Sequence, residues 1–207
     1  MAKKILLIYP KSPIMNREDR CQQPTKELIV IPPLPPTDLL YLAAIAEKEG
    51  LEAFVRDYSL GGDFEQDLKD IKPDYLVANI ATPTLHNDLE CFSTAKKILP
   101  KIINIAKGAI FLTKNSELML KNKAITYIIS GEAEETLQEI LKKEKEPKDI
   151  LGLWYRDGFV VKFSGVRPFI ENLDELPFPA RHLIDNNIYR RPDNNKVQAV
   201  IKVSRGC

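Results

Sequence analysis

The chain has 207 residues, enough for one domain of ordinary size with additional segments. Thirty basic residues stand against twenty-nine acidic ones, and this balance disfavours nucleic acid and anionic membranes as partners. No apolar run approaches the roughly 18 residues of a membrane span. The apolar stretch after the first four residues stops at Pro10, too short for a signal peptide, so we expect a cytoplasmic protein. Three widely spaced cysteines, Cys21, Cys91 and Cys207, argue against a disulfide framework.

Buried strands alternating with helices are expected over the first two thirds of the chain. A continuous apolar run predicts a strand at 4–9, and the long proline-containing loop at 10–36 is expected to be a poorly ordered lid. Thr37 and Asp38 are N-cap candidates for a helix that ends at Gly50. Further strands are expected at 51–55, 74–80, 102–106 and 125–129, and further helices at 64–71, 85 to about 99, 116–121 and from 131 onward.

This alternation predicts an α/β fold of the flavodoxin-like or Rossmann-like kind, a five-stranded parallel sheet with helices on both faces. Ligands of such sheets bind beyond the carboxyl ends of the strands, at the switch point of the strand order. We expect this domain to occupy residues 1–146 and a β-hairpin with a connector to occupy 147–195. Residues 196–207 are expected to form the first strand of a further, truncated domain.

The hairpin is expected from two strand-like runs, 151–156 and 159–163, with Asp157-Gly158 between them as a type I′ turn. A proline-stiffened connector follows, and a last strand is predicted at 197–203.

The last eight residues, Val200-Ile-Lys-Val-Ser-Arg-Gly-Cys207, resemble the lead-in to the cluster loop of radical SAM enzymes. In that family the first barrel strand runs into a Cys-x3-Cys-x2-Cys motif, whose three thiolates hold a [4Fe–4S] cluster with one iron open to S-adenosylmethionine. The resemblance implies that Cys207 is the first cluster ligand. It also implies two more cysteines in the parent protein, at the fourth and seventh positions counted on from Cys207.

Three upstream segments resemble the cobalamin-binding domains fused to these enzymes and the connector that follows such domains: 33–50, 127–134 and 172–181. The chain is therefore identified by resemblance as the N-terminal part of a cobalamin-binding-domain-containing radical SAM enzyme. The parent would cleave S-adenosylmethionine reductively, for radical chemistry or methyl transfer on a small-molecule substrate. The remainder of the radical SAM core, in the same chain, would be the partner of this module, which we expect to be inactive alone.

Small or polar residues at the strand ends suit a large, flat corrin. The resemblance implies that Thr82, Thr84, Gly108, Ser130 and Gly131 line the cobalamin site. The sequence departs from the family where Gly-Gly-Pro-His often follows the fourth strand, because 107–110 reads Lys-Gly-Ala-Ile. The lysine side chain is placed to cover one corrin face, and a glycine and the histidine are missing.

Two interpretations of the module stay open. One is a cobalamin site of weak affinity, no tighter than micromolar, with no histidine ligand, since Asp-x-His-x-x-Gly is also missing. The other is a purely structural or interaction domain that caps the radical SAM core and has no cofactor of its own. A receiver domain is disfavoured because the first strand ends in Tyr9-Pro10-Lys11, and no glycine-rich nucleotide-binding motif occurs.

The remaining candidates have ordinary structural interpretations. His86 is expected at the surface or at a helix cap, and Cys91 as buried filler within a helix. Glu132 and Glu134 are expected as helix-start charges that suit the helix dipole.

Overall fold

A computed structural model describes residues 2–12, 33–112, 118–119 and 121–202. Most of the predicted lid at 10–36, half of the predicted helix at 116–121, and Cys207 with the residues just before it lie outside these ranges. None of the helices in the described ranges combines the length and the apolarity that a bilayer-spanning helix needs.

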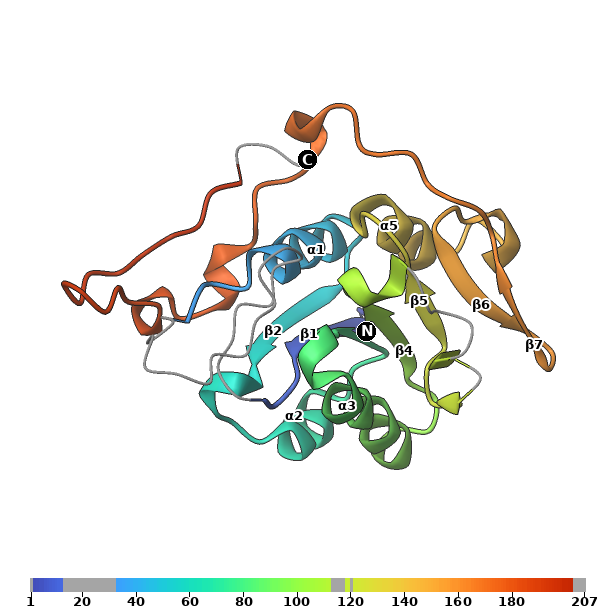
Figure 1. The fold of residues 1–207 in the computed structure, drawn as a ribbon, viewed down its shortest axis with the longest axis horizontal. Coiled ribbons are helices and arrows are strands. Elements are labelled where there is room, and N and C mark those ends of the chain that lie inside the picture. Colours follow the sequence, from blue (N-terminus) through green and yellow to red (C-terminus); the bar gives the residue numbers. More distant parts are fainter. Residues whose placement is uncertain (1, 13–32, 113–117, 120, 203–207) are drawn as a thin grey trace.

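A single mixed sheet organises the described part of the chain (Figure 1). Its strand order is β2-β1-β3-β4-β5-β6-β7, with the first five strands parallel and the last two antiparallel. The predicted α/β fold with its parallel sheet is confirmed, and the hairpin extends that sheet. The strands are β1 (Lys4–Tyr9), β2 (Glu52–Asp57), β3 (Tyr75–Asn79), β4 (Ile103–Lys107), β5 (Tyr127–Ile129), β6 (Leu153–Asp157) and β7 (Val160–Phe163).

Helices cover both faces of the sheet, as predicted. Figure 1 shows α1 and α5 over one face and α2 and α3 over the other. The helices are α1 (Thr37–Lys48), α2 (Phe64–Ile71), α3 (Leu85–Ile98) and α5 (Glu134–Lys142). Short 3-10 turns lie at Tyr58–Leu60, Thr82–Thr84, Ala109–Leu112, Pro147–Asp149, Leu173–Glu175, Arg181–Leu183 and Asn186–Ile188.

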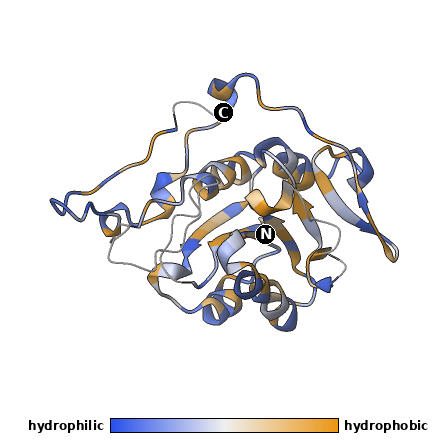
Figure 2. Ribbon diagram, in the orientation of Figure 1, coloured by the Kyte–Doolittle hydropathy of each residue, from blue (hydrophilic) through white to orange (hydrophobic). Residues whose placement is uncertain are grey.

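The core consists of two apolar layers, one on each side of the sheet. Side chains alternate along β1, so that Ile5 and Leu7 pack under α1 while Leu6 and Ile8 pack toward α2 and α3. All four are fully buried, which explains why the strand reads as one continuous apolar run. Figure 2 shows the mainly hydrophobic strands at the centre and the hydrophilic residues on the outer helix surfaces.

The strand order places a switch point between β1 and β3. From β1 the chain passes through α1 to β2 on one side, whereas β3 lies on the other side of β1. The connections diverge there, and in parallel sheets this is where a crevice opens at the carboxyl ends of the strands. The first turn of α1 therefore lies at the edge where a ligand would be expected.

The hairpin turn differs from the prediction by one residue. Asp157 pairs with Val160, so the turn consists of Gly158 and Phe159 rather than of Asp157 and Gly158. Gly158 has a φ of +59°, whereas Phe159 is not among the residues of positive φ, which is the pattern of a type II′ turn with glycine first. Asp157 is drawn into the ladder instead, and its carboxylate accepts a hydrogen bond from Lys162.

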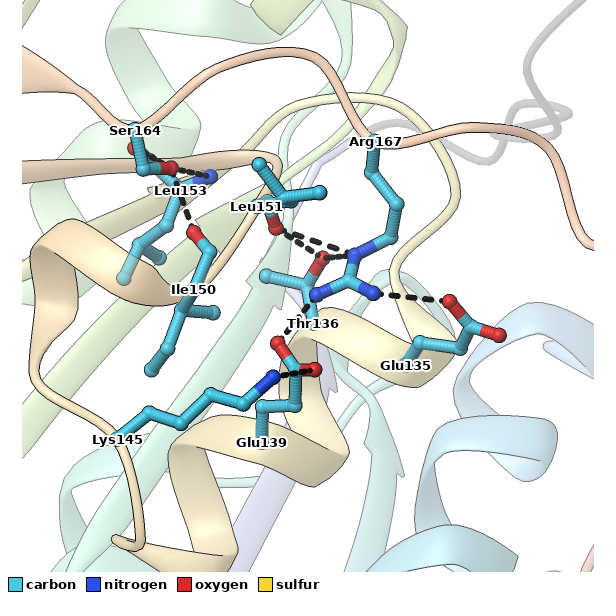
Figure 3. Close-up of polar contacts among 9 residues, drawn as sticks. All are labelled: Glu135, Thr136, Glu139, Lys145, Ile150, Leu151, Leu153, Ser164 and Arg167. Carbon is cyan, nitrogen blue, oxygen red and sulfur yellow. Dashed lines mark hydrogen bonds and ion pairs between the residues drawn. The ribbon is translucent and has the colours of Figure 1, made fainter.

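The segment after the hairpin is fixed to α5 by Arg167 (Figure 3). Its guanidinium forms ion pairs with Glu135 and Glu139 and donates to the hydroxyl of Thr136 and the carbonyl of Leu151. The side chain is only 9% exposed although it carries a charge. The hairpin and α5 are therefore joined by a polar clamp as well as by the sheet.

The connector then crosses the α1 face to the β2 side of the molecule (Figure 1). The backbone N–H of Ala180 donates to the carbonyl of Leu40 in α1, and His182 pairs with Glu47 at 2.9 Å. Ala180 and Tyr189 are buried.

The strand predicted at 197–203 does not form in the part of it that is described. Val197 makes one isolated antiparallel bridge to Arg190, and 198–202 has no regular structure. Its apolar residues suit a strand, but among the described residues it pairs with no strand of the sheet.

Candidate functional site at the switch point

Four polar side chains meet where the strands end at the switch point. Tyr9, Asn79 and Lys107 are the last residues of β1, β3 and β4, and Asp38 lies in the first turn of α1. Because Asn79 is in register with Lys107 and β1 lies beside β3, these strand ends reach the same edge. We call these four residues the Asp38 cluster.

Asp38 accepts from the other three members through both of its carboxylate oxygens. The Tyr9 hydroxyl donates to Oδ1 at 2.5 Å. The Asn79 amide and the Lys107 ammonium both donate to Oδ2, each at 2.5 Å. The side chains of Lys107 and Asp38 are only 10% and 13% exposed, so this is a nearly buried ion pair.

Electrostatics keep the Asp38 carboxylate ionised. Burial alone would raise its pKa, but Lys107, a second lysine at Lys202, and the hydrogen bonds from Lys107 and Tyr9 outweigh that cost. The pKa of Asp38 therefore lies well below its ordinary value. The Asp38 carboxylate is therefore negatively charged, and the Lys107 ammonium neutralises that charge.

Asp38 does not act as the predicted helix cap. The N-cap position of α1 is Pro36, with no side-chain hydrogen bond, and the Asp38 side chain turns to the cluster instead. The expected role of Lys107 changes too, because its side chain is bound to Asp38 rather than free to lie over a ligand.

Two of the predicted cofactor-lining residues lie just beyond β3. Thr82 and Thr84 form a 3-10 turn before α3. The Thr84 hydroxyl donates to the carboxylate of buried Asp88, which also accepts from the backbone N–H of Ala81. This network makes Thr84 part of the turn's own structure, whereas Thr82 is exposed.

Gly108 is packed against the backbone of the neighbouring strand end. A β-carbon at this position would lie 2.1 Å from the carbonyl oxygen of Ile80, and the φ of Gly108 is +146°. Both facts require glycine. The residue thus has a structural reason to be glycine that involves no ligand.

Ser130 and Gly131 follow β5 and behave differently from each other. The Ser130 hydroxyl donates to the carbonyl of Phe111 at 2.7 Å. Gly131 has a φ of +85°, and a β-carbon there would meet nothing within 4 Å. Of the five predicted residues, Gly131 is thus one that faces open space.

The residues present therefore do not fit an open corrin seat. Thr84, Gly108 and Ser130 are engaged within the protein, and the switch point is filled by the Asp38–Lys107 pair. The stretch 107–110, which departs from the family pattern, begins with Lys107, the residue that forms the ion pair with Asp38.

The predicted cluster ligand cannot be placed, because Cys207 lies outside the described residues, as does Cys21. Cys91 is buried in α3, as expected, and His86 is exposed on the same helix. Within the described ranges no group of three or more His, Cys, Asp or Glu side chains is placed to hold a metal ion.

The Asp38 cluster was missed by the sequence interpretation, which treated its members separately. The signal was present in part: Tyr9, Asn79 and Lys107 are polar residues that directly follow buried apolar runs. The sequence alone did not show that Asp38, 69 residues before Lys107, supplies the opposite charge.

Comparisons with known proteins relate the chain to methyltransferases and to a cyclase. No protein-family model matches it. It is 28% identical over 202 residues to the uncharacterized methyltransferase PH0819 of Pyrococcus horikoshii, covering 88% of this chain and 43% of that protein. It is 23% identical over 186 residues to the anaerobic magnesium-protoporphyrin IX monomethyl ester cyclase of Cereibacter sphaeroides, covering 84% of this chain and 30% of the cyclase.

A solved structure with the same fold is the radical S-adenosylmethionine methyltransferase TsrM of Kitasatospora setae, with cobalamin and a [4Fe–4S] cluster bound. The TM-score is 0.61 at 18% identity, over 92% of this chain and 35% of TsrM. The chain thus spans less than half the length of each of these relatives. Over most of its length, the chain is similar in sequence to part of a methyltransferase and part of a cyclase, and it shares its fold with part of a cobalamin-bound radical SAM methyltransferase.

Proposed function

We propose that the chain is the N-terminal, cobalamin-domain-type module of a radical SAM enzyme. The whole enzyme would use a [4Fe–4S] cluster to cleave S-adenosylmethionine reductively and would act on a small-molecule substrate. The observation that carries the proposal is the match in fold to TsrM over 92% of this chain. The Arg-Gly-Cys sequence at 205–207 supports it independently, since it resembles the lead-in to the cluster loop.

We propose further that this module binds cobalamin no more tightly than micromolar. The Asp38–Lys107 ion pair supports this, because a ligand at the switch point would have to displace a nearly buried pair of charges. The same observation favours the second function, a structural module that caps the radical SAM core.

The reductive cleavage is tested on the whole protein encoded by the gene. After anaerobic reconstitution with iron and sulfide, and reduction with dithionite, it should convert S-adenosylmethionine to 5′-deoxyadenosine and methionine. Replacement of Cys207 by alanine should abolish both products, because two thiolates hold the cluster poorly. If the reconstituted protein forms no 5′-deoxyadenosine, the radical SAM assignment is wrong.

Cobalamin binding is tested by titrating hydroxocobalamin into the chain and following the visible spectrum and the heat. We expect a dissociation constant in the micromolar range or weaker, and nanomolar binding would contradict the proposal. The double variant Asp38→Asn/Lys107→Gly removes the ion pair without leaving either charge alone. Tight binding by this variant would identify a decayed cofactor pocket, whereas unchanged binding would support the structural cap.

A further inference from the structure

Exposed lysines gather where the chain enters β4 and β5. They lie in residues 96–102, ahead of β4, and in residues 121–126, ahead of β5, and neither segment contains an acidic residue. The exposed ones are Lys97, Lys101, Lys121 and Lys123. Because β4 and β5 are parallel neighbours, these four lysines lie at the edge where the parallel strands begin, which we call the amino edge. The Asp38 cluster lies at the opposite edge of the sheet.

Helix dipoles account for only part of this lysine group. Lys97 lies in the last turn of α3, where a helix favours a cation. Lys101 and Lys123 instead lie in turns, and the dipole effect does not extend beyond the last helical turn. The turn of Lys123 is also fixed to the sheet, because the side-chain amide of Asn104 in β4 donates to the carbonyl of Ala124 at 3.0 Å. These lysines are therefore positioned at the amino edge without a local need for their charge.

The hairpin presents an aromatic ring at the same edge. Since β6 runs antiparallel to β5, the turn formed by Gly158 and Phe159 lies at the edge where β5 begins (Figure 1). The guanidinium of Arg156 donates to the carbonyl of Asn122 at 3.1 Å and so ties the end of the hairpin to the lysine-bearing segment before β5. Phe159 is fully exposed, at 102%.

The exposed ring is carried by a stiff support. Trp154 and Phe163 stack across the hairpin with their ring centroids 4.8 Å apart. The positive φ of Gly158 suits the tight turn that holds Phe159. Among the described residues Phe159 gains no burial, so its ring is available to a partner.

We propose that the amino edge binds single-stranded nucleic acid, with the four lysines on its phosphates and Phe159 stacked on a base. Proteins that hold single strands combine a basic track with aromatic side chains in this way. The net charge of +1 does not oppose this, because the attraction of a polyanion depends on where the charges lie and not only on their sum. The site uses neither cluster nor cobalamin, so it stands or falls independently of the proposed radical SAM activity.

Fluorescence anisotropy of labelled single-stranded RNA and DNA oligonucleotides of about 12 nucleotides tests the site in the intact chain. We expect micromolar binding of at least one of them at about 50 mM potassium chloride, weakening as the salt concentration rises. The double variant Lys101→Met/Lys123→Met should reduce the slope of log K against log salt by about 1.4, since each phosphate contact contributes about 0.7. The control Lys11→Met/Lys196→Met removes two exposed lysines elsewhere and should leave the slope unchanged.

The stacking contact is tested at constant salt. Phe159→Ser should weaken binding about tenfold, the effect of losing one stacked base, and should leave the salt slope unaltered, whereas Phe159→Trp should keep the affinity. Circular dichroism checks that each variant is folded. The proposal is overturned if the unaltered chain binds neither oligonucleotide, if Lys101→Met/Lys123→Met behaves like the lysine control, or if Phe159→Ser binds as tightly as the unaltered chain. Binding to phosphatidylserine vesicles without binding to either oligonucleotide would identify a membrane surface instead.

Discussion

The ammonium of Lys107 lies 2.5 Å from Oδ2 of Asp38 and joins the last residue of β4 to the first turn of α1. The pair connects two elements that are distant in sequence, at the edge where the strand order diverges. It is nearly buried, so each charge depends on the other for its solvation.

Breaking the pair from one side should cost more than removing it. Lys107→Met leaves Asp38 without its closest cation, and we expect the free energy of unfolding to fall by about 3 kcal/mol. Asp38→Asn/Lys107→Met should be more stable than the Lys107→Met single variant, because it leaves no nearly buried charge unpaired. Urea unfolding followed by circular dichroism measures both. If the double variant is no more stable than Lys107→Met, the two side chains are not directly coupled.

The pair should also make stability depend on pH at the acid end. Because the pKa of Asp38 is lowered in the folded protein, its contribution is complete above the ordinary aspartate pKa of about 3.9 and is lost as pH falls toward the lowered value. The difference in unfolding midpoint between the unaltered chain and Asp38→Asn/Lys107→Met should therefore narrow between about pH 4 and pH 2. A difference that stays constant over that interval would show that Asp38 does not titrate as inferred.

Two glycines at strand ends should respond very differently to alanine. At Gly108 a methyl group would meet the Ile80 carbonyl oxygen at 2.1 Å, so we expect Gly108→Ala to cost about 3 kcal/mol or more. Gly131 has a positive φ but open space around it, and Gly131→Ala should cost about 1 kcal/mol. Thermal unfolding of the two variants provides the comparison. Equal destabilisation would mean that β3 and β4 can separate at this edge.

The largely buried ion pairs of Arg167 can be compared with an exposed arginine ion pair elsewhere in the chain. Arg167→Met removes ion pairs to Glu135 and Glu139, and we expect a loss of about 2 kcal/mol because the guanidinium is largely buried. Arg191→Met removes an exposed pair with Asp193 and should not change stability measurably. Urea unfolding of both variants checks this. If the two behave alike, the clamp around Arg167 contributes no more than a surface pair.

The sheet could be predicted from the sequence because strands buried on both faces consist of continuous runs of apolar residues. The apolar run of β1 needs no partner to be recognised, and the predicted range of α2 agrees with the structure residue for residue. The hairpin was also predictable, but its exact turn was not. Asp157-Gly158 suits a turn, yet the cross-strand pair between Asp157 and Val160 shifts the turn by one residue.

The site was harder to predict because its contacts are not local. Asp38 is an ordinary helix-start residue in sequence, and only the arrangement of β1, β3 and β4 places it beside Lys107. The segment at 198–202 shows the converse case. Its residues favour a strand, but a strand needs a neighbour, and hydrogen bonds to Tyr189 and Arg181 take the place of a ladder.

The pairing of the hairpin with β5 limits where recombination can divide the gene without disrupting the fold. β5 has three residues and lies between β4 and β6, pairing with Leu153 and Trp154 on its outer side. A recombination that cut the gene after residue 146 would leave those backbone groups without partners and uncover the core beside α5, where Leu153 is fully buried. A recombination that preserves the fold should therefore keep the first 167 residues together, because the strands β6 and β7 and the ion pairs of Arg167 complete the sheet and its contact with α5.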